Sequence, residues 1–488
     1  MIMKTRYIVY LIGVLLSFYS CVDDKGTYDY LEKSSVRITF DEYIFDGVIG
    51  EETNIEPKLA LDEGDDLSNY EFEWQLNGQI VGHEKVLSYV PTEAITYYAL
   101  FSVIDKATKF RVMQKVQLYV GSPYKTGWAI LSKLNNKTML SHIRDNAGYI
   151  NYLNIYETVN NEELGANPYK LVEHYSGRLT TPEILVINQD AKGALEVDGN
   201  TMAKVLYTTQ EFTEGVPDNF VVKDAAYIYY TDALLTTNGQ VYIRQLKNPD
   251  TAGFHSAPYS SVPVYVNKGM KITQMIQSNF NKTRHMLMYD EKNHRLLCLG
   301  SASKNQTGEI LEVTDLGLED QTLVYADIFY PGSFNCKYML LLKDRNGNHT
   351  LKTFKLAYDL GEALVSSVET FNFPSSYLTE KSKFYGSKDN LGKRLFFTGG
   401  AANNEIYYYE KSTNRVTLFT TCSSEITDLQ LNKGSTALGV GMKNGFIVYS
   451  VTETVLNNKE VKVLHEVGNI GEVIDVIYRY GSPSNMYL

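Results

Sequence analysis

The sequence predicts an all-β protein in which a small β-sandwich precedes a β-propeller of about seven blades. Short apolar strands are separated by turn residues, and no long segment has a helical hydrophobic period. A unit of two strands, a turn and a polar loop also recurs at a spacing of roughly 50 residues. The expected parts of the 488 residues are a signal segment at 1–20, a tether at 21–32, the sandwich at 33–122 and the propeller at 123–488.

The first twenty residues have the organisation of a secretory signal. Lys4 and Arg6 form a basic flank, and an apolar run over residues 7–19 ends shortly before Cys21. This arrangement is typical of a cleaved signal, whereas a membrane span needs about 20 apolar residues. Cys21 stands where a bacterial lipoprotein signal places the residue that is lipidated and becomes the mature N-terminus. An ordinary signal followed by a chance cysteine is the alternative.

The segment after Cys21 is too polar to pack and is expected to be a solvated tether. Asp23 and Asp24 follow Cys21 almost directly. This acidic start resembles the export signal of Bacteroidota-type surface lipoproteins. The resemblance implies that the two aspartates direct the protein to the outer leaflet of the outer membrane, where the lipid on Cys21 anchors it.

Residues 33–122 are expected to form an immunoglobulin-like sandwich, because short strands recur there at intervals marked by turns. Asn77-Gly78 is a strong hairpin signal, since both residues accept a positive φ. Trp74, just before this turn, is expected in the core. The expected strands are Val36–Phe40, Tyr70–Leu76, Thr96–Val103 and Val112–Val120.

Three features of this half resemble the PKD-like family of lipoproteins. They are the tether phrase at 25–30, the Trp74 strand with its Asn-Gly turn, and the junction Ser122-Pro123-Tyr124-Lys125-Thr126-Gly127-Trp128. The resemblance covers residues up to about 145. It implies a location on the cell surface beside a Sus-type (SusC/SusD-like) TonB-dependent transporter. It also implies capture of a nutrient, for which glycan, peptide and iron-chelate cargo all stay open.

From Gly127 onward the strand pairs recur seven times. The last apolar strand, Glu472–Tyr478, is expected to complete the first unit and close the ring. A pair of stacked sandwiches is the competing architecture. The units are expected at 127–141, 183–195, 226–244, 285–298, 338–354, 394–409 and 436–449.

Composition limits the possible partners. The formal charge is −11, and removing residues 1–20 with Lys4 and Arg6 lowers it by two more. Such an acidic chain is not expected to bind nucleic acid. Cys298, Cys336 and Cys422 can form one disulfide at most, and burial as small apolar residues is expected for all three. The 38 tyrosines suit half-buried strands and also adaptable contact surfaces.

No motif predicts catalysis, a cofactor or a metal. The sequence has no Gly-x-Ser-x-Gly elbow, His-Glu-x-x-His or phosphate loop. Residues 344–348 are better explained as a hairpin turn than as a calcium loop. His285 and His294 could face each other across one hairpin, but two ligands do not make a zinc site. Carboxylate pairs for glycoside hydrolysis stay open, because such residues can be far apart in sequence.

The expected function is therefore nutrient binding at the cell surface and not catalysis. A propeller enzyme acting on glycosides is one alternative, and a structural subunit of the transporter assembly is another. The loops at one end of the propeller channel are the expected ligand site. In the tyrosine clusters at 227–230 and 407–409, at least one ring each is expected to pack between blades.

Overall fold

The computed structural model divides into two units, Met1–Gly121 and Ser122–Leu488. The residues described are 36–146, 148–175, 182–190, 192–246, 255, 257–266, 269–277, 283–301, 309–359, 361–389 and 391–481. Cys21, Asp23 and Asp24, with the whole signal and tether, lie outside them. The boundary between the units falls before Ser122, and the boundary expected from the sequence falls after it.

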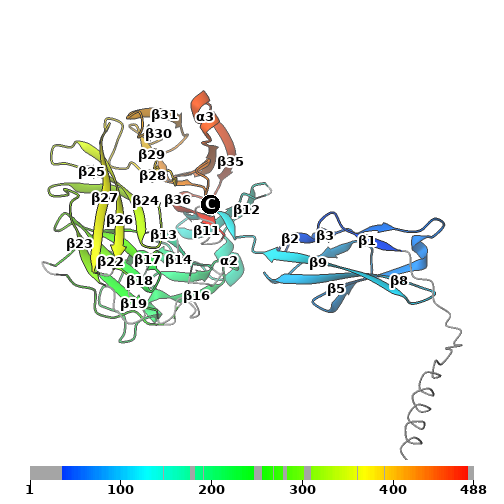
Figure 1. Cartoon of the computed structure of the whole chain (residues 1–488). Helices are drawn as coiled ribbons and strands as arrows, with labels where there is room; N and C mark the ends of the chain where they lie inside the picture. The colour runs from blue at the N-terminus through cyan, green and yellow to red at the C-terminus, as the bar shows by residue number, and fades with distance from the viewer. Residues whose placement is uncertain are drawn as a thin grey trace, which may run out of the picture. The chain divides into compact units, whose positions relative to one another are not determined.

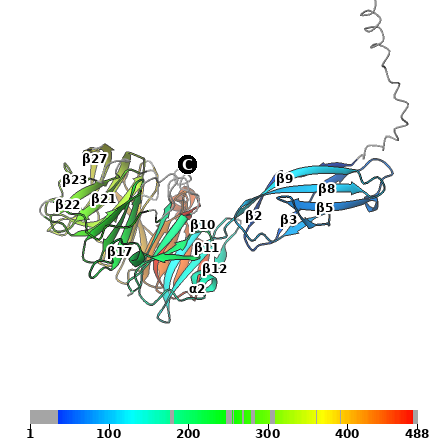
Figure 2. The same cartoon turned by 90° about the horizontal axis from the view of Figure 1, so that it is seen from below.

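Unit 1 is built from one five-stranded sheet and two short strand pairs (Figure 2). The sheet has the order β2-β9-β8-β5-β6, and β2 is parallel to β9. The pairs are β1-β4 and β3-β7. The bounds are β1 Arg37–Thr39, β2 Ile44–Val48, β3 Thr53–Ile55, β4 Lys58–Ala60, η1 Leu67–Asn69, β5 Tyr70–Leu76, β6 Gln79–Gly82, β7 Leu87–Tyr89, β8 Thr96–Asp105 and β9 Arg111–Gly121.

The core of unit 1 forms around aromatic rings. Trp74 is fully buried, its ring lies 4.7 Å from that of Phe101, and its Nε1 donates to the Lys85 carbonyl at 3.2 Å. Ile38 of β1 and Ile55 of β3 pack into the same cluster, so both short pairs cover the sheet. The predicted core position of Trp74 and the hairpin at Asn77-Gly78 are confirmed.

Seven antiparallel sheets make up the described part of unit 2, and we number them in chain order (Figure 1). Sheet 1 joins the two ends of the unit, because the last strand β36 pairs with β10. Its strands are β10 Thr126–Leu134, β11 Lys137–Arg144, β12 Ile150–Tyr152 and β36 Glu472–Tyr480. The predicted pairing of residues 472–478 with the first unit is confirmed.

The other sheets each use consecutive strands. Sheet 2 consists of β13 Pro168–Tyr175, β14 Pro182–Asn188, β15 Leu195–Asp198 and β16 Lys204–Tyr207. Sheet 3 consists of β17 Val222–Ile228, β18 Thr231–Thr236 and β19 Val241–Gln245. Sheet 4 consists of β20 Ile272–Ile276, β21 His285–Asp290, β22 Arg295–Gly300 and β23 Ile310–Val313. Sheet 5 consists of β24 Thr322–Tyr330, β25 Asn335–Lys343, β26 His349–Asp359 and β27 Glu362–Phe373. Sheet 6 consists of β28 Phe384–Gly386, β29 Arg394–Gly399, β30 Glu405–Glu410 and β31 Arg415–Thr421. Sheet 7 consists of β32 Ile426–Leu431, β33 Ala437–Met442, β34 Gly445–Ser450 and β35 Lys462–Gly468.

Helix is scarce in the described chain. α2 Ile155–Asn160 and α3 Glu453–Asn458 have six residues each, and η2 Thr208–Gln210 is a single 3-10 turn. Among the described residues, no helix has the length and apolar character needed to cross a membrane. The predicted all-β class is confirmed.

A buried apolar cluster lies between each sheet of unit 2 and the next, because alternate side chains of a strand point to opposite faces. The last of these clusters joins sheet 7 to sheet 1 and contains Trp128, Phe446 and Val473. Two glycines of β33 make room for it. A Cβ at Gly439 would lie 2.5 Å from the Trp128 ring, and one at Gly441 would lie 2.6 Å from Val473.

Most predicted hairpins are confirmed by the strand pairing, including β21-β22, β25-β26, β29-β30 and β33-β34. The turn expected at Thr237-Asn238-Gly239 is confirmed, but the strand expected to pair across it is wrong. β18 and β19 pair across this turn, while β17 turns into β18 at Tyr229-Tyr230. Two bulky tyrosines at a turn gave no local signal.

Candidate functional site

One cavity in unit 2 is lined by one strand from each of the seven sheets. These strands are the first strands of sheets 2 to 7 and β36 of sheet 1. The cavity volume is about 200 Å³. At roughly 30 Å³ of liquid volume each, this is room for six or seven waters or for one small molecule. Each of these seven strands, or the residues just after it, supplies at least one lining side chain: Lys170, Asp224, Met275, Asp327, Lys388, Gln430 and Tyr480.

Two lysine–aspartate pairs balance the charge of the cavity. Lys170 Nζ donates to Asp224 Oδ1 at 2.7 Å. Lys388 Nζ donates to the Asp327 carboxylate and, at 2.9 Å, to the Ile328 carbonyl. Burial disfavours the charged form of Lys170, but the neighbouring Asp224 and Asp475 outweigh it and raise the pKa of the ammonium group. Each lysine side chain thus lies against an aspartate carboxylate.

Hydroxyl and amide groups form the rest of the polar lining. Gln430 Nε2 donates to the Tyr385 hydroxyl at 2.6 Å, and Lys388 Nζ lies 4.9 Å from the centre of the Tyr385 ring. Burial raises the pKa of Tyr385 and of Tyr480. Both phenols therefore keep their protons at neutral pH and can donate hydrogen bonds.

Half-buried aspartates link neighbouring strands around the cavity. Asp475 of β36 accepts a hydrogen bond from the Leu171 backbone N–H at 2.7 Å, and Asp428 of β32 accepts one from Val476 at 2.8 Å. Burial raises the pKa of Asp428 to about 6, and that of Asp475 rises through burial and the nearby Asp428. These carboxyl groups hold sheets 7, 1 and 2 together at their inner strands.

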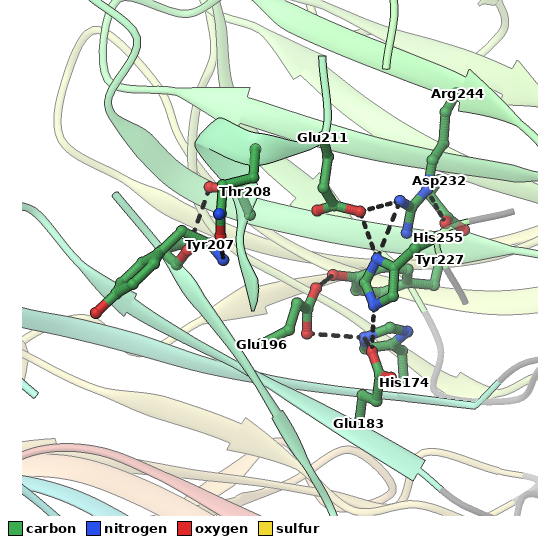
Figure 3. A network of polar contacts seen from close by, with 12 residues as sticks. His174, Glu183, Glu196, Tyr207, Thr208, Glu211, Tyr227, Asp232, Arg244 and His255 are labelled. Carbon is green, nitrogen blue, oxygen red and sulfur yellow. Dashed lines mark hydrogen bonds and ion pairs between the residues drawn. The ribbon is translucent and has the colours of Figure 1, made fainter. Parts of the chain in front are cut away.

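A second polar region lies buried between sheets 2 and 3 (Figure 3). His174 Nε2 is 3.1 Å from Glu196 Oε2 and 3.8 Å from Glu183 Oε2. His255 Nε2 lies 3.0 Å from the same Glu183 oxygen. The side chains of His174 and Glu196 are each 1% exposed. One imidazole nitrogen and two carboxylate oxygens thus lie within 4.8 Å of one another in a buried group, and His255 borders this group through Glu183.

Further residues hold this group in place. Tyr227 donates from its hydroxyl to Glu196 Oε1 at 3.1 Å, and its ring stacks on His174 at 3.7 Å. His255 Nδ1 donates to Glu211 at 2.5 Å. Burial disfavours the charged form of His255, but its contacts with Glu183 and Glu211 outweigh it and raise the pKa of the ring to about 10.

Arg244 anchors the outer side of the network. Its Nη1 donates to Glu211, and its Nε donates to Asp232 at 2.6 Å. Its guanidinium group also lies 4.5 Å from the centre of the Tyr259 ring. Charged groups from both sheets are therefore joined without solvent between them, and the arrangement resembles the outer support of a metal ligand set.

The residues singled out in the sequence lie mostly elsewhere. Cys298, Cys336 and Cys422 are buried and free, as expected for small apolar residues. Tyr227 is buried between sheets 2 and 3, and Tyr407 and Tyr409 between sheets 5 and 6, so the expected packing of both clusters is confirmed. The Asp344 carboxylate accepts from the Asn346 and Asn348 backbone, which confirms the turn.

The suggestion that His285 and His294 face each other is wrong. His285 begins β21 and is buried, whereas His294 lies in the turn at the opposite end of that hairpin. The sequence did not single out His174, Glu183, Glu196 or His255. Only Glu183 has a clear local signal, as the one charged residue of the otherwise mostly apolar strand Pro182–Asn188.

Comparison with known protein families finds one match, in the first part of the chain. Residues 21–168 match the PKD-like family. This PKD-like region covers unit 1 from residue 21 onward and the start of unit 2. It confirms the resemblance carried by the tether, the Trp74 strand and the junction. No curated protein sequence matches the chain.

Two solved structures match the chain at low similarity. The first is a quinonprotein alcohol dehydrogenase-like protein from Bacteroides thetaiotaomicron, with 13% identity and a TM-score of 0.40, over 90% of this chain and 97% of that one. The second is the periplasmic gluconolactonase of Pseudomonas aeruginosa, with 10% identity and a TM-score of 0.47, over 72% of this chain and 99% of that one. Neither structure shows what the present chain binds or whether it catalyses a reaction.

Proposed function

We propose that unit 2 is a closed seven-bladed β-propeller whose central cavity binds one small, uncharged, hydroxyl-rich ligand, such as one sugar unit of a glycan. The observation that carries this proposal is the lining of the cavity. Two internally paired lysines, two protonated phenols and a glutamine amide surround about 200 Å³. Apolar clusters between every consecutive pair of sheets, including sheets 7 and 1, support the closed ring.

The charge of the lining selects among the three cargo classes. Lys170 and Lys388 are each neutralised by an aspartate, so a strongly anionic iron chelate would find no free cation among the described lining residues. A hydroxylated ligand can instead exchange hydrogen bonds with Tyr385, Tyr480 and Gln430 without burying a charge. A peptide would have to present a small polar side chain or its end, because the cavity lacks room for more.

The location belongs to the same proposal. The Cys21 lipid would hold the protein at the outer membrane, with Asp23 and Asp24 directing it outward, beside a SusC/SusD-like transporter. Tethering both proteins to one surface raises their effective concentration, so weak capture suffices. Protease shaving of intact cells tests this: Cys21→Ala should release the protein or leave it unprocessed, and alanine at 23 and 24 should hide it from the protease. Unchanged cleavage of the aspartate variant would contradict the export role.

Ligand binding is tested by titration calorimetry of the purified protein with single monosaccharides, short glycans, dipeptides and a ferric chelate. We expect binding of a neutral sugar, weakened by Tyr385→Phe or Lys388→Met. Losing one hydrogen bond to the ligand should reduce affinity by about tenfold, which corresponds to roughly 1.4 kcal/mol.

Tyr289→Phe is the matched control, since Tyr289 is also buried but donates to the Gln321 carbonyl away from the cavity. An equal loss in this control would show that the effect is on the fold. Cleavage of a glycan during the titration would favour the enzyme alternative. Binding unaffected by both cavity variants would place the ligand elsewhere, and no binding to any probe would favour a structural subunit.

A further inference from the structure

The buried group between sheets 2 and 3 has the composition of a metal site. His174 Nε2 and one oxygen each from Glu183 and Glu196 all lie within 4.8 Å of one another. His255 adds a second imidazole nitrogen 3.0 Å from the Glu183 oxygen. An ion about 2.0–2.2 Å from nitrogen and oxygen ligands needs neighbouring ligand atoms only slightly more than 3 Å apart. The His174–Glu196 contact of 3.1 Å and the His255–Glu183 contact of 3.0 Å are already near this value, and the other ligand atoms would have to move closer around an ion.

We propose that His174, Glu183, Glu196 and His255 bind one divalent transition-metal cation, of the Zn²⁺ type, between sheets 2 and 3. Two imidazoles and two carboxylates without thiolate suit zinc and its first-row neighbours better than Ca²⁺ or Mg²⁺, which prefer oxygen alone. The site is separate from the cavity that the proposed ligand would occupy.

The surrounding contacts match those that orient metal ligands. A ligating histidine usually donates its other ring nitrogen to a carboxylate, which fixes the tautomer and directs the lone pair to the ion. His255 does this through Nδ1 to Glu211, which Arg244 holds in turn. Glu196 has one oxygen held by the Tyr227 hydroxyl, so its other oxygen is directed toward His174.

The charge balance also favours a cation. Glu183, Glu196, Glu211 and Asp232 bring four carboxylates into this network, and Arg244 is the one permanent cation that contacts them among the described residues. A buried excess of negative charge is unfavourable unless it is neutralised. A protonated His255 balances one of these charges in the ion-free network, and a divalent ion bound to its neutral ring would balance two. The outer oxygen of Glu211, Oε2, is buried without a partner among the described residues.

Such an ion would act as a clamp between sheets. Its ligands come from β13, β14 and β15 of sheet 2 and from His255, which follows β19 of sheet 3. Because these elements are far apart in sequence, the ion would be bound only after both sheets have formed. We therefore expect metal to stabilise unit 2 without taking part in catalysis.

The test uses the full chain, stripped with a chelator, loaded with Zn²⁺ and desalted. Elemental analysis should then find one Zn²⁺ per chain, and the thermal unfolding midpoint should rise on loading. Co²⁺ in place of Zn²⁺ should give visible absorption bands of a nitrogen- and oxygen-ligated ion. Ca²⁺ loading should leave the midpoint unchanged.

Variants assign the ion to these residues. His174→Gln and Glu196→Gln should abolish retention, and Tyr227→Phe, which removes only the support of Glu196, should weaken affinity by about 10–100-fold. His465→Gln is the control, since His465 contacts Asn151 in another part of unit 2. If a ligand variant fails to fold, the Co²⁺ spectrum and affinity of Tyr227→Phe still test the site.

Substoichiometric Zn²⁺ on the unmodified protein, with no shift of its midpoint, would overturn the proposal and leave a network of buried ion pairs. Retention unchanged in His174→Gln and Glu196→Gln would also overturn it, because the ion would then lie elsewhere.

Discussion

The buried pair between Arg479 of β36 and Glu173 of β13 joins the end of the chain to sheet 2, and breaking it should destabilise unit 2. Arg479 Nε donates to Glu173 at 2.7 Å, and its Nη1 donates to the Gly199 carbonyl at 2.7 Å and to the Tyr124 carbonyl. The side chains are 0% and 1% exposed. Removing one partner of such a pair costs about 3–5 kcal/mol, because a buried charge is left alone.

A double-mutant cycle measures this contact. We expect Arg479→Met and Glu173→Met each to lower the unfolding free energy of unit 2 by about 3–5 kcal/mol. The double variant should cost less than the sum by about 1–3 kcal/mol, since it leaves no unpaired charge. It should stay below the parent, because the Gly199 and Tyr124 carbonyls lose their donor.

Fluorescence gives a selective readout. The chain has two tryptophans, with Trp74 buried in unit 1 and Trp128 in unit 2, 4.8 Å from Tyr478 of β36. Denaturant unfolding in a Trp74→Phe background therefore follows unit 2 alone. Arg345→Met is the control, because Arg345 is exposed in a turn. Additive costs in the cycle would refute the idea that this pair couples β36 to sheet 2.

Three further predictions concern unit 2. Burial raises the pKa of Asp428 to about 6. The stability that this carboxyl group contributes is therefore complete below its ordinary pKa and is lost as the pH rises through 6. Asp428→Asn should remove up to about 3 kcal/mol of this decline in the unfolding free energy, measured from pH 4 to 8. The three buried cysteines, whose pKa values burial raises, should react with a thiol reagent only after unfolding, and rapid reaction of the native protein would contradict their placement. Gly439→Ala should cost about 1–3 kcal/mol by overpacking, because its methyl group would meet the Trp128 ring; an unchanged midpoint of Trp128 fluorescence would contradict this contact.

The sequence predicts the hairpins well because their signals are local. Asn77-Gly78 and Asn346-Gly347 turn where expected. Asn77, Gly78 and Gly347 adopt a positive φ there, which glycine and asparagine accept at little cost. The turn at Tyr229-Tyr230 was missed, because tyrosine has no such preference. Pairing of β36 with β10 could be expected from the apolar strand at 472–480, since a ring with one incomplete sheet exposes an unpaired edge.

The polar sites could not be predicted in the same way. The cavity residues lie on seven strands from Lys170 to Tyr480, and no fixed spacing relates them. The buried cluster reaches from His174 to His255 and depends on how two sheets pack. Only the charged residues in buried strands, such as Glu183 and Asp232, mark these places in the sequence. A single charged residue in an apolar strand indicates that it has a buried partner, but not which residue that partner is.

β13 shows how alternation along one strand produces both buried ionic contacts. Leu171 and Glu173 point toward sheet 1, where Glu173 meets Arg479, while Val172 and His174 point toward sheet 3. Apolar clusters of similar composition would allow the sheets to pack in several different orders. A buried charged side chain, in contrast, is stable only beside the sheet that carries its ionic partner. We infer that Glu173 and His174 fix sheet 2 between sheets 1 and 3, so that the first and last strands of unit 2 meet in the correct order. We therefore expect the double variant, Arg479→Met with Glu173→Met, to adopt a less well-defined folded structure than its free energy of unfolding suggests. An unfolding transition broader than that of the parent protein would show this.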